Sequence, residues 1–137
     1  MPALPRFDWR GPALFTLSAD GTGPAAAQHN SDSSAVTSSH RAAPGEIIRL
    51  YATGLGAVQP PVESGAAPEG LSTAVGTVTV TIGGRPAGVV FAGLAPNFAG
   101  VYQINASVPD GVPAGDAAVV ISVDGTPSTG QATLAVQ

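Results

Sequence analysis

The second half of this chain is a succession of short runs in which apolar and polar residues alternate, and each run ends at a turn signal. In one run Val78, Val80 and Ile82 alternate with threonines, and the run stops at Gly83-Gly84. Runs of the same kind are found at 101–108 and 119–123. Period-two alternation places every second side chain on one face of a strand, while glycine, proline and aspartate favour tight turns between antiparallel strands. The pattern therefore predicts an all-β fold.

The same reasoning extends to the rest of the chain, where we expect further short strands. The predicted strands are 13–17, 24–28, 46–53, 75–82, 87–92, 100–108, 117–123 and 131–136. In the strand 46–53, Ile48 and Leu50 are expected to point inward. Short strands separated by many turns favour a Greek-key β-sandwich of about seven or eight strands over a closed barrel. No helix and no internal repeat is predicted.

The length of 137 residues predicts one domain that can bury enough surface to fold alone. We expect this domain to span 13–137 and to follow an extended arm or linker at 1–12. The arm contains Phe7 and the chain's one tryptophan, Trp9. These two side chains either cap one edge of the core or dock onto a neighbouring module or subunit. A long connection rich in glycine, proline and alanine is expected at 54–71, and connections of that length are commonly functional or mobile.

The composition excludes several classes of function. Charged residues make up 10% of the chain, well below the roughly 25% of ordinary soluble domains, and its basic residues are all arginine. A net charge of −4 argues against a nucleic-acid partner or an anionic membrane, since both require clustered basic side chains. No apolar run approaches the ~18 residues of a membrane-spanning helix. Without cysteine there is no disulfide or thiolate metal site, and without lysine there is no isopeptide crosslink.

Two segments carry a resemblance to a known family. Residues 43–56 read APGEIIRLYATGLG and are similar to the "PG…I.LYATGLG" strand of a domain found at the C-termini of many long secreted proteins of Solibacter and other acidobacteria. Residues 100–115 read GVYQINASVPDGVPAG and resemble the "GLYQVN…VP.GVP.G" signature of that domain. With the strand 78–84 and the opening at 12–16, the similarity extends over about 12–136, nearly the whole chain.

This resemblance implies an immunoglobulin-like fold related to the IPT/TIG modules of surface proteins. It also implies secretion, normally as the last module of a longer polypeptide. It implies no catalytic residue, because the family has no established activity.

A polar stretch between two histidines groups residue types that occur in catalytic sites. His29 and His40 flank Asp32, Ser33 and Ser34, from which a Ser-His-Asp constellation or a weak metal site can be drawn. The stretch lacks a Gly-x-Ser-x-Gly elbow, a rigid element that would hold the serine, and a fixed tetrahedral ligand set. We therefore expect a solvated polar loop, and we predict that the protein is not an enzyme and has no catalytic residue, cofactor or metal site.

Three aspartates lie in predicted turns near strand ends, where a weak calcium site would fit: Asp110, Asp116 and Asp124. Turn chemistry explains an aspartate before a glycine without any ion. The aspartate bonds to the local backbone, and the glycine adopts a positive φ. The turn interpretation is the simpler one.

The aromatic residues divide between core and surface. Phe15, Phe91 and Tyr102 have apolar neighbours in the strand pattern and are expected in the core, with the Tyr102 hydroxyl reaching a backbone group. Rings outside that pattern are candidate platforms for a sugar or contacts for a protein. The candidate interaction residues are Phe7, Trp9, Tyr51 and Phe98.

Two strands also carry ladders of neutral, hydrogen-bonding side chains. The ladders are Thr77, Thr79 and Thr81, and Gln103, Asn105 and Ser107. Faces of this kind can pack against another sheet without burying charge. Threonine also fills solvent-facing strand positions through β-propensity alone.

Together these features predict a non-catalytic extracellular module with a structural, adhesive or self-assembly role, in which the arm 1–12 adds to the sheet of the next copy. Its predicted partners are proteins, either further copies or modules of a longer polypeptide. The alternative is a carbohydrate-binding accessory module of a secreted enzyme, with a glycan as partner. Since nine carboxylates face no lysine, few ion pairs are expected, and stability should be nearly flat between about pH 4 and pH 8.

Overall fold

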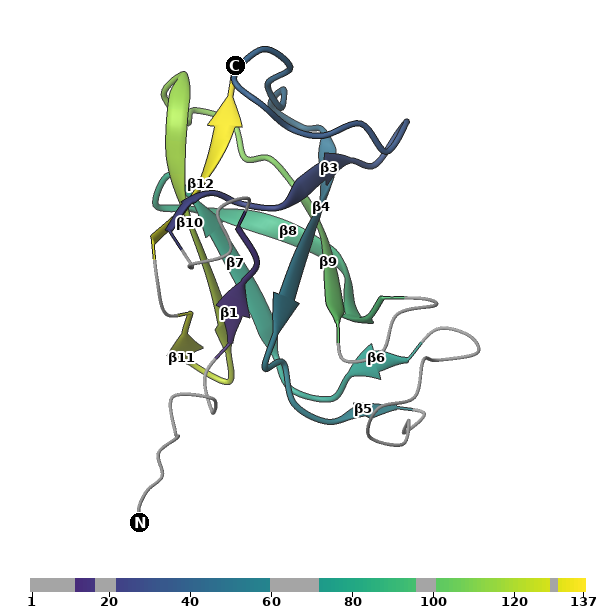
Figure 1. The fold of residues 1–137 in the computed structure, drawn as a ribbon. Helices are drawn as coiled ribbons and strands as arrows, with labels where there is room; N and C mark the ends of the chain where they lie inside the picture. Colours follow the sequence, from purple (N-terminus) through teal and green to yellow (C-terminus); the bar gives the residue numbers. More distant parts are fainter. Residues whose placement is uncertain (1–11, 17–21, 60–71, 96–100, 129–130) are drawn as a thin grey trace.

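The computed structural model describes residues 12–16, 22–59, 72–95, 101–128 and 131–137, and every regular element in them is a β-strand (Figure 1). The strands are β1 (Ala13–Leu14), β2 (Thr22–Pro24), β3 (Ala27–His29), β4 (Ile47–Thr53), β5 (Val58–Gln59), β6 (Thr73–Ala74), β7 (Val78–Ile82), β8 (Arg85–Leu94), β9 (Tyr102–Ser107), β10 (Gly115–Val123), β11 (Thr126–Pro127) and β12 (Gln131–Val136). The described residues contain no helix long and apolar enough to cross a membrane. The all-β prediction is confirmed.

Hydrogen bonds join eight of the strands into one path, β1-β4-β9-β8-β7-β10-β12-β2. The sheet is strongly curled, like half of a barrel, and it is mixed because β2 runs parallel to β12 (Figure 1). Three very short strands, β3, β6 and β11, pair with strands of this path, and a fourth, β5, pairs with β6. The expected number of about seven or eight strands is therefore too low, since segments of two or three residues cannot show an alternating pattern. The Greek-key sandwich stays a prediction.

Strand β8 connects the two halves of the curled sheet. Its first residues pair with β7, and its residues from Gly88 to Leu94 pair with β9. The register shifts between Val89 and Phe91. An irregularity of this kind bends a strand and increases its local twist, so β8 can belong to both halves without interrupting the hydrogen-bonded path.

The turn signals in the sequence occur where the hairpins close. Gly83 and Gly84 both have positive φ, 61° and 78°, and Ile82 pairs with Arg85 across them. Two consecutive residues with positive φ are the signature of a type I′ turn, which glycine adopts without steric cost. Asp124-Gly125 forms the same kind of two-residue turn between β10 and β11.

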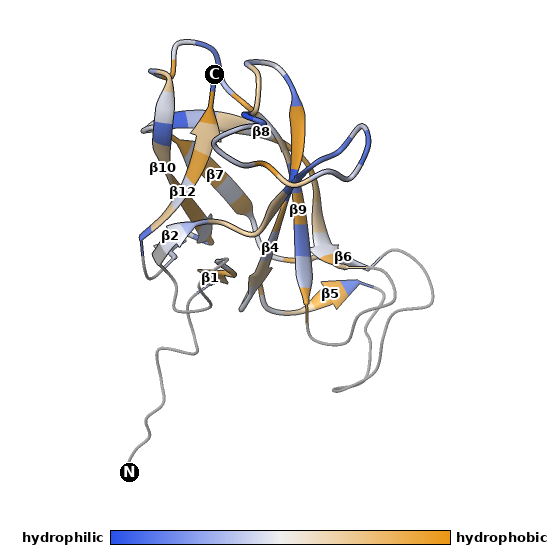
Figure 2. Cartoon of the chain, turned by 45° about the horizontal axis from the view of Figure 1, so that its top comes forward, coloured by the Kyte–Doolittle hydropathy of each residue, from blue (hydrophilic) through white to orange (hydrophobic). Residues whose placement is uncertain are grey.

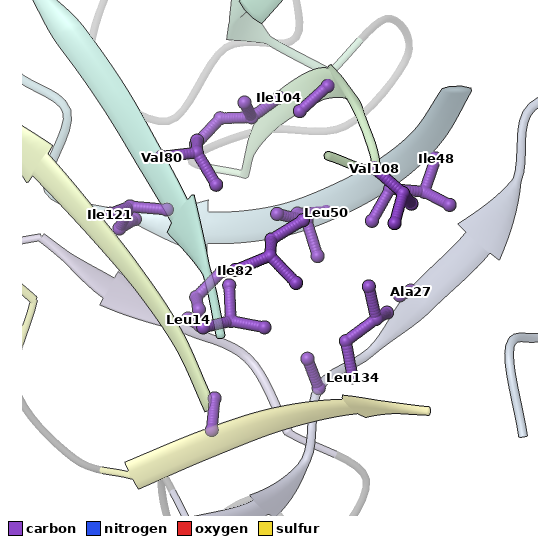
Figure 3. Packing of buried hydrophobic residues seen from close by; sticks show 14 of the residues in the cluster. Leu14, Ala27, Ile48, Leu50, Val80, Ile82, Ile104, Val108, Ile121 and Leu134 are labelled. Carbon is purple, nitrogen blue, oxygen red and sulfur yellow. The ribbon is translucent and has the colours of Figure 1, made fainter. Parts of the chain in front are cut away.

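The core lies inside the curl. Side chains from β7, β10 and β12 face those from β4 and β9, and the segments before β4 contribute further apolar groups (Figure 3). Ile48 and Leu50 are fully buried, as the alternation in the strand 46–53 predicts. Each buried leucine or isoleucine contributes about 1.5–3 kcal/mol relative to an exposed one. The labelled core residues in Figure 3 are Leu14, Ala27, Ile48, Leu50, Val80, Ile82, Ile104, Val108, Ile121 and Leu134.

The first described segments cover the free edges of two long strands. β1 and β3 pair with β4, whereas β2, which lies between them in the chain, pairs with β12. The strand predicted at 24–28 is therefore two strands, because the chain crosses from β12 to β4 after Pro24. Pro12, which the sequence assigned to the arm, is fully buried.

Two other sequence expectations change. Phe15, expected in the core, is 39% exposed, because Leu14 and Thr16 take the inward positions on either side of it. The long connection expected at 54–71 contains the short strand β5, and its remainder from 60 onward lies outside the described residues.

Candidate functional site

The polar stretch after β3 brings the suspected catalytic residue types together, but not in catalytic order. The Ser34 hydroxyl donates to Asp32 Oδ1 at 2.6 Å, and its oxygen lies 3.3 Å from His40 Nδ1. In a nucleophilic triad the histidine stands between the serine and the carboxylate. Here the Asp32 carboxylate accepts directly from the Ser34 hydroxyl. Asp32 therefore does not orient His40, and the hydroxyl proton points to the carboxylate and not to the histidine.

The electrostatics of this stretch agree with a structural turn. The Ser34 hydroxyl and then its backbone N–H lower the pKa of Asp32, which makes the carboxylate a poor proton acceptor. Ser33 has a positive φ of 64°, and its hydroxyl accepts from Arg49 Nη1 at 3.0 Å. These bonds hold the loop in place. They do not activate a nucleophile.

His29 departs from the expectation of a solvated loop. It is 3% exposed, its Nδ1 contacts the carboxylate of Glu46, and its Nε2 lies 3.0 Å from the backbone carbonyl of His40. The alternation in β3 points Gln28 outward and both of its neighbours inward. The strand predicted at 24–28 ends one residue before His29, which is the last residue of β3, and this left His29 in the predicted loop.

The described residues contain no group of three or more histidine, aspartate or glutamate side chains that could hold a metal ion. Of the aspartates considered for calcium, Asp124 has φ 50° in the turn after β10, and its Oδ1 accepts from the Thr77 N–H at 2.8 Å. Asp124 thus has the backbone conformation of a turn residue, but its carboxylate accepts from a residue 47 positions away and not from the local backbone that the turn prediction assumed.

The outward side of β3, β4 and β9 forms a surface that we call the polar face. Its residues are Gln28, Arg49, Tyr51, Gln103 and Asn105, which alternate with buried residues along their strands. The Tyr51 hydroxyl donates to Gln28 Oε1 at 2.9 Å, and Gln103 Nε2 donates to Asn105 Oδ1 at 2.8 Å. Hydrophilic and hydrophobic residues alternate along β9 (Figure 2).

Among the described residues, the guanidinium of Arg49 on the polar face bonds only to neutral acceptors. It donates to the side chain and the carbonyl of Asn30 at 2.8 and 3.1 Å, in addition to Ser33. It makes no ion pair with a carboxylate among the described residues. The polar face therefore offers amide groups, a phenol ring and one positive charge to a partner.

The outward side of the other half of the sheet carries an uncharged patch that we call the neutral face, bordered on β10 by the exposed Asp116. Its residues are Thr79, Thr81, Pro86, Ala118, Val120, Ser122 and Thr133. Thr81 lies opposite Pro86 on β8 and opposite Val120 on β10. None of these residues is charged, and each is exposed or half-buried.

Tyr51 is the one predicted interaction residue whose surroundings the structure describes, and it lies on the polar face. Phe7, Trp9 and Phe98 lie outside the described residues. Val120, which is 37% exposed at the centre of the neutral face, was not among the predicted interaction residues. The sequence does indicate an exposed valine here, because successive side chains of a strand point to opposite faces, so that one of the consecutive Val119 and Val120 must point outward.

A groove of about 470 Å³ lies beside the Asp124 turn, between Gly54–Ala57, Val75 and Thr126. Ligand pockets of this size usually carry a few polar groups that fix an orientation. Among the described residues that line this groove, Asp124 is the one ionisable side chain, and it already accepts from Thr77. The groove therefore offers little that would orient a small molecule.

No model of a known protein family matches the chain, and no curated protein matches it. Among solved structures, the chain is similar to a crystal structure described as "Putative phosphatase" from Bacteroides thetaiotaomicron, with a TM-score of 0.42 and 16% sequence identity. The similarity covers 71% of this chain and 16% of that one. A likeness of this degree carries no conclusion about fold or activity.

Proposed function

We propose that this chain is a non-catalytic extracellular module with an immunoglobulin-like Greek-key sandwich fold, and that its role is structural self-assembly. The neutral face is the observation that carries the proposal. The resemblance of residues 43–56 and 100–115 to a domain of secreted proteins supports the location and the fold. The placement of β4 and β9 on one side of the core and of β7, β10 and β12 on the other supports a two-layered arrangement.

The physical reason lies in what happens when two acidic copies approach each other. Each copy carries a net charge of −4, so their fields repel at long range. Burying a charge in the contact adds a desolvation cost. A face of threonine, alanine, valine and proline avoids that cost, and the centres of protein interfaces are depleted of charged residues in the same way.

The arm at 1–12, with Phe7 and Trp9, supplies a second contact in this proposal. An arm that adds to the sheet of the next copy would join copies head to tail, and repeated addition would build a polymer. Removal of 1–11, which keeps the buried Pro12, should then lower the mass of the assemblies seen by light scattering. An unchanged mass would remove the arm from the proposal and leave the neutral face alone.

Charge placed on the neutral face tests the proposal itself. We expect Val120→Lys to shift the chain toward the monomer in sedimentation equilibrium, because a lysine would be buried in the contact. Val75→Lys is the matched control, since Val75 is 66% exposed and lies off the neutral face, before β7. Equal association of both variants and the unaltered chain would contradict a role for this face.

Carbohydrate binding is the second candidate, and the polar face favours it. A half-exposed tyrosine ring beside amide groups is the combination that suits a neutral sugar, and Gln28, Gln103 and Asn105 surround Tyr51. Tyr51→Ala should weaken retention on an insoluble polysaccharide, and so should Trp9→Ala if the arm contributes a ring. The absence of binding on a glycan array, together with no effect of either substitution on polysaccharide pull-down, would contradict carbohydrate binding.

A further inference from the structure

Both ring nitrogens of His29 face groups that only accept hydrogen bonds. Its Nδ1 contacts Glu46 Oε2, and its Nε2 lies 3.0 Å from the carbonyl oxygen of His40. A neutral imidazole carries one N–H, whereas an imidazolium carries two. With an ionised carboxylate on one side and a carbonyl on the other, the cation alone can donate to both. The His40 carbonyl also accepts from the Thr37 N–H at 3.1 Å, so it keeps a donor in either state. A neutral ring would nevertheless donate to only one of the two groups and would turn a bare nitrogen toward the oxygen of the other, which is unfavourable.

The other charged groups around His29 are few. The ring of His40 stacks on it, with centroids 4.0 Å apart and planes at 25°, and Asp32 lies close enough to act on it through its charge. Arg49 belongs to the opposite side of the sheet, because it alternates with the inward residues of β4. Arg41 directs its guanidinium to the Val136 carbonyl at 3.5 Å. The carboxylates therefore dominate the field at the ring.

Glu46 connects this histidine to the contact between the β3–β4 connection and the last strand. Its second oxygen, Oε1, accepts from the backbone N–H of Ala43 at 2.9 Å. The adjacent Ala42 donates to the Ala135 carbonyl and accepts from the Gln137 N–H, each at 2.9 Å. The contacts from His29 through Glu46 therefore reach Ala43, the neighbour of Ala42. Ala42 is the residue that bonds the β3–β4 connection to β12.

We propose that His29 and Glu46 form a proton-dependent latch on residues 30–46, closed when the imidazole is protonated and released from β12 when the proton is lost. Release would break the two backbone bonds of Ala42 and free the edge of β12 at Ala135 and Gln137. A free strand edge is a site where another strand can pair. The latch is independent of the proposed self-assembly, because it rests on contacts within one chain.

The balance of effects on the histidine supports this geometry. Burial alone would lower the pKa of His29, but the hydrogen bond to Glu46, the carbonyl of His40, and the charges of Glu46 and Asp32 outweigh it and raise the pKa above its ordinary value. The protonated form is thus favoured by folding. Release is expected on the alkaline side of the ordinary histidine pKa of about 6.5.

An NMR titration of the full chain tests the latch, with the same titration of the chain unfolded in urea as the reference. We expect the ring protons of His29 to titrate at higher pH in the folded chain than in the unfolded chain. We also expect the amide signals of Ala42 and Gln137 to move with the same midpoint as His29. A midpoint for His29 below about 6.5, or amide signals of Ala42 and Gln137 that do not follow it, would overturn the proposal.

Two carboxylate substitutions show which contact sets the midpoint. Glu46→Gln keeps a side chain of the same size and removes the charge that contacts His29. Asp32→Asn removes a charge that lies near the ring without contacting it. The midpoint of His29 should fall in both variants, and farther in Glu46→Gln. Equal shifts would mean that the general field, and not the contact with Glu46, holds the proton, and the latch would be wrong.

Discussion

The phenol of Tyr102 donates a hydrogen bond of 2.6 Å to the backbone carbonyl of Gly56, which joins the start of β9 to the segment that leaves β4. The two residues are 46 positions apart in the chain. Burial raises the pKa of Tyr102, so the phenol keeps the proton that it donates. The hydrogen bond therefore ties β9 to the segment after β4, and this segment lines the groove beside Asp124.

Tyr102→Phe should lower the free energy of unfolding by about 0.5–1.5 kcal/mol, because the ring keeps its packing and only the hydrogen bond is lost. Urea unfolding at neutral pH measures the change. Tyr51→Phe is the matched control, since it removes a bond between two side chains on the polar face. We expect a smaller loss there, and a loss at Tyr51 equal to that at Tyr102 would contradict the anchoring role.

Gly93→Ala should be among the most destabilising single-methyl additions in the chain. A Cβ at Gly93 would lie 2.1 Å from the Ser72 carbonyl oxygen and 2.9 Å from Thr73 Cα, both backbone atoms of the segment paired with β8. Relief requires β6 to move, and overpacking of this kind costs about 1–3 kcal/mol. Thermal unfolding measures the loss.

Gly88→Ala, in the same strand, is the control for that substitution. The nearest atom to its added methyl group is the Ser107 hydroxyl oxygen at 3.1 Å, a side-chain atom on an exposed surface. A small effect is expected. If Gly88→Ala and Gly93→Ala were equally destabilising, the close approach of β6 to β8 would be wrong.

The loss of stability on truncating a core side chain can be predicted. Leu50→Ala should cost about 2–5 kcal/mol, because Leu50 is fully buried at the centre of β4 and its loss leaves a cavity. Val120→Ala, on the neutral face of β10, should change the stability of the monomer by no more than about 0.5 kcal/mol. Denaturant titrations of both variants at low protein concentration check the contrast between inward and outward positions.

The contact between His29 and Glu46 changes the expected pH dependence. A group whose pKa is raised by folding stabilises fully below its unfolded pKa, and this stabilisation is lost as the pH rises through the folded pKa. The pKa of His29 is raised, so the urea midpoint should fall on the alkaline side of about pH 6.5. Glu46→Gln should flatten that decline. A midpoint in the unaltered chain that does not change up to about pH 9 would restore the flat profile expected from composition.

The long strands were predictable because each has one buried face. β4, β9, β10 and β12 alternate strictly between inward and outward residues, and their predicted bounds differ from the observed ones by at most two residues. The turns between β7 and β8 and between β10 and β11 follow from Gly83-Gly84 and Asp124-Gly125, for which few other conformations are favourable.

The short strands and the burial of His29 could not be predicted, because they depend on contacts between residues far apart in the sequence. β2 and β3 contain three residues each, too few for a period, and only pairing with β12 and β4 defines them. The burial of His29 depends on Glu46 and His40, which no local pattern connects to it. Phe15 was misjudged because it follows the two-residue strand β1, and hydrophobicity alone does not show which way a side chain beside so short a strand points.

The mass of the purified chain in solution, measured by multi-angle light scattering across a concentration series, tests the proposed self-assembly most directly. We expect a mass that rises with concentration beyond that of the 13.4 kDa chain, because the neutral face permits contact between acidic copies. A monomer at every concentration would contradict self-assembly as the function of this module.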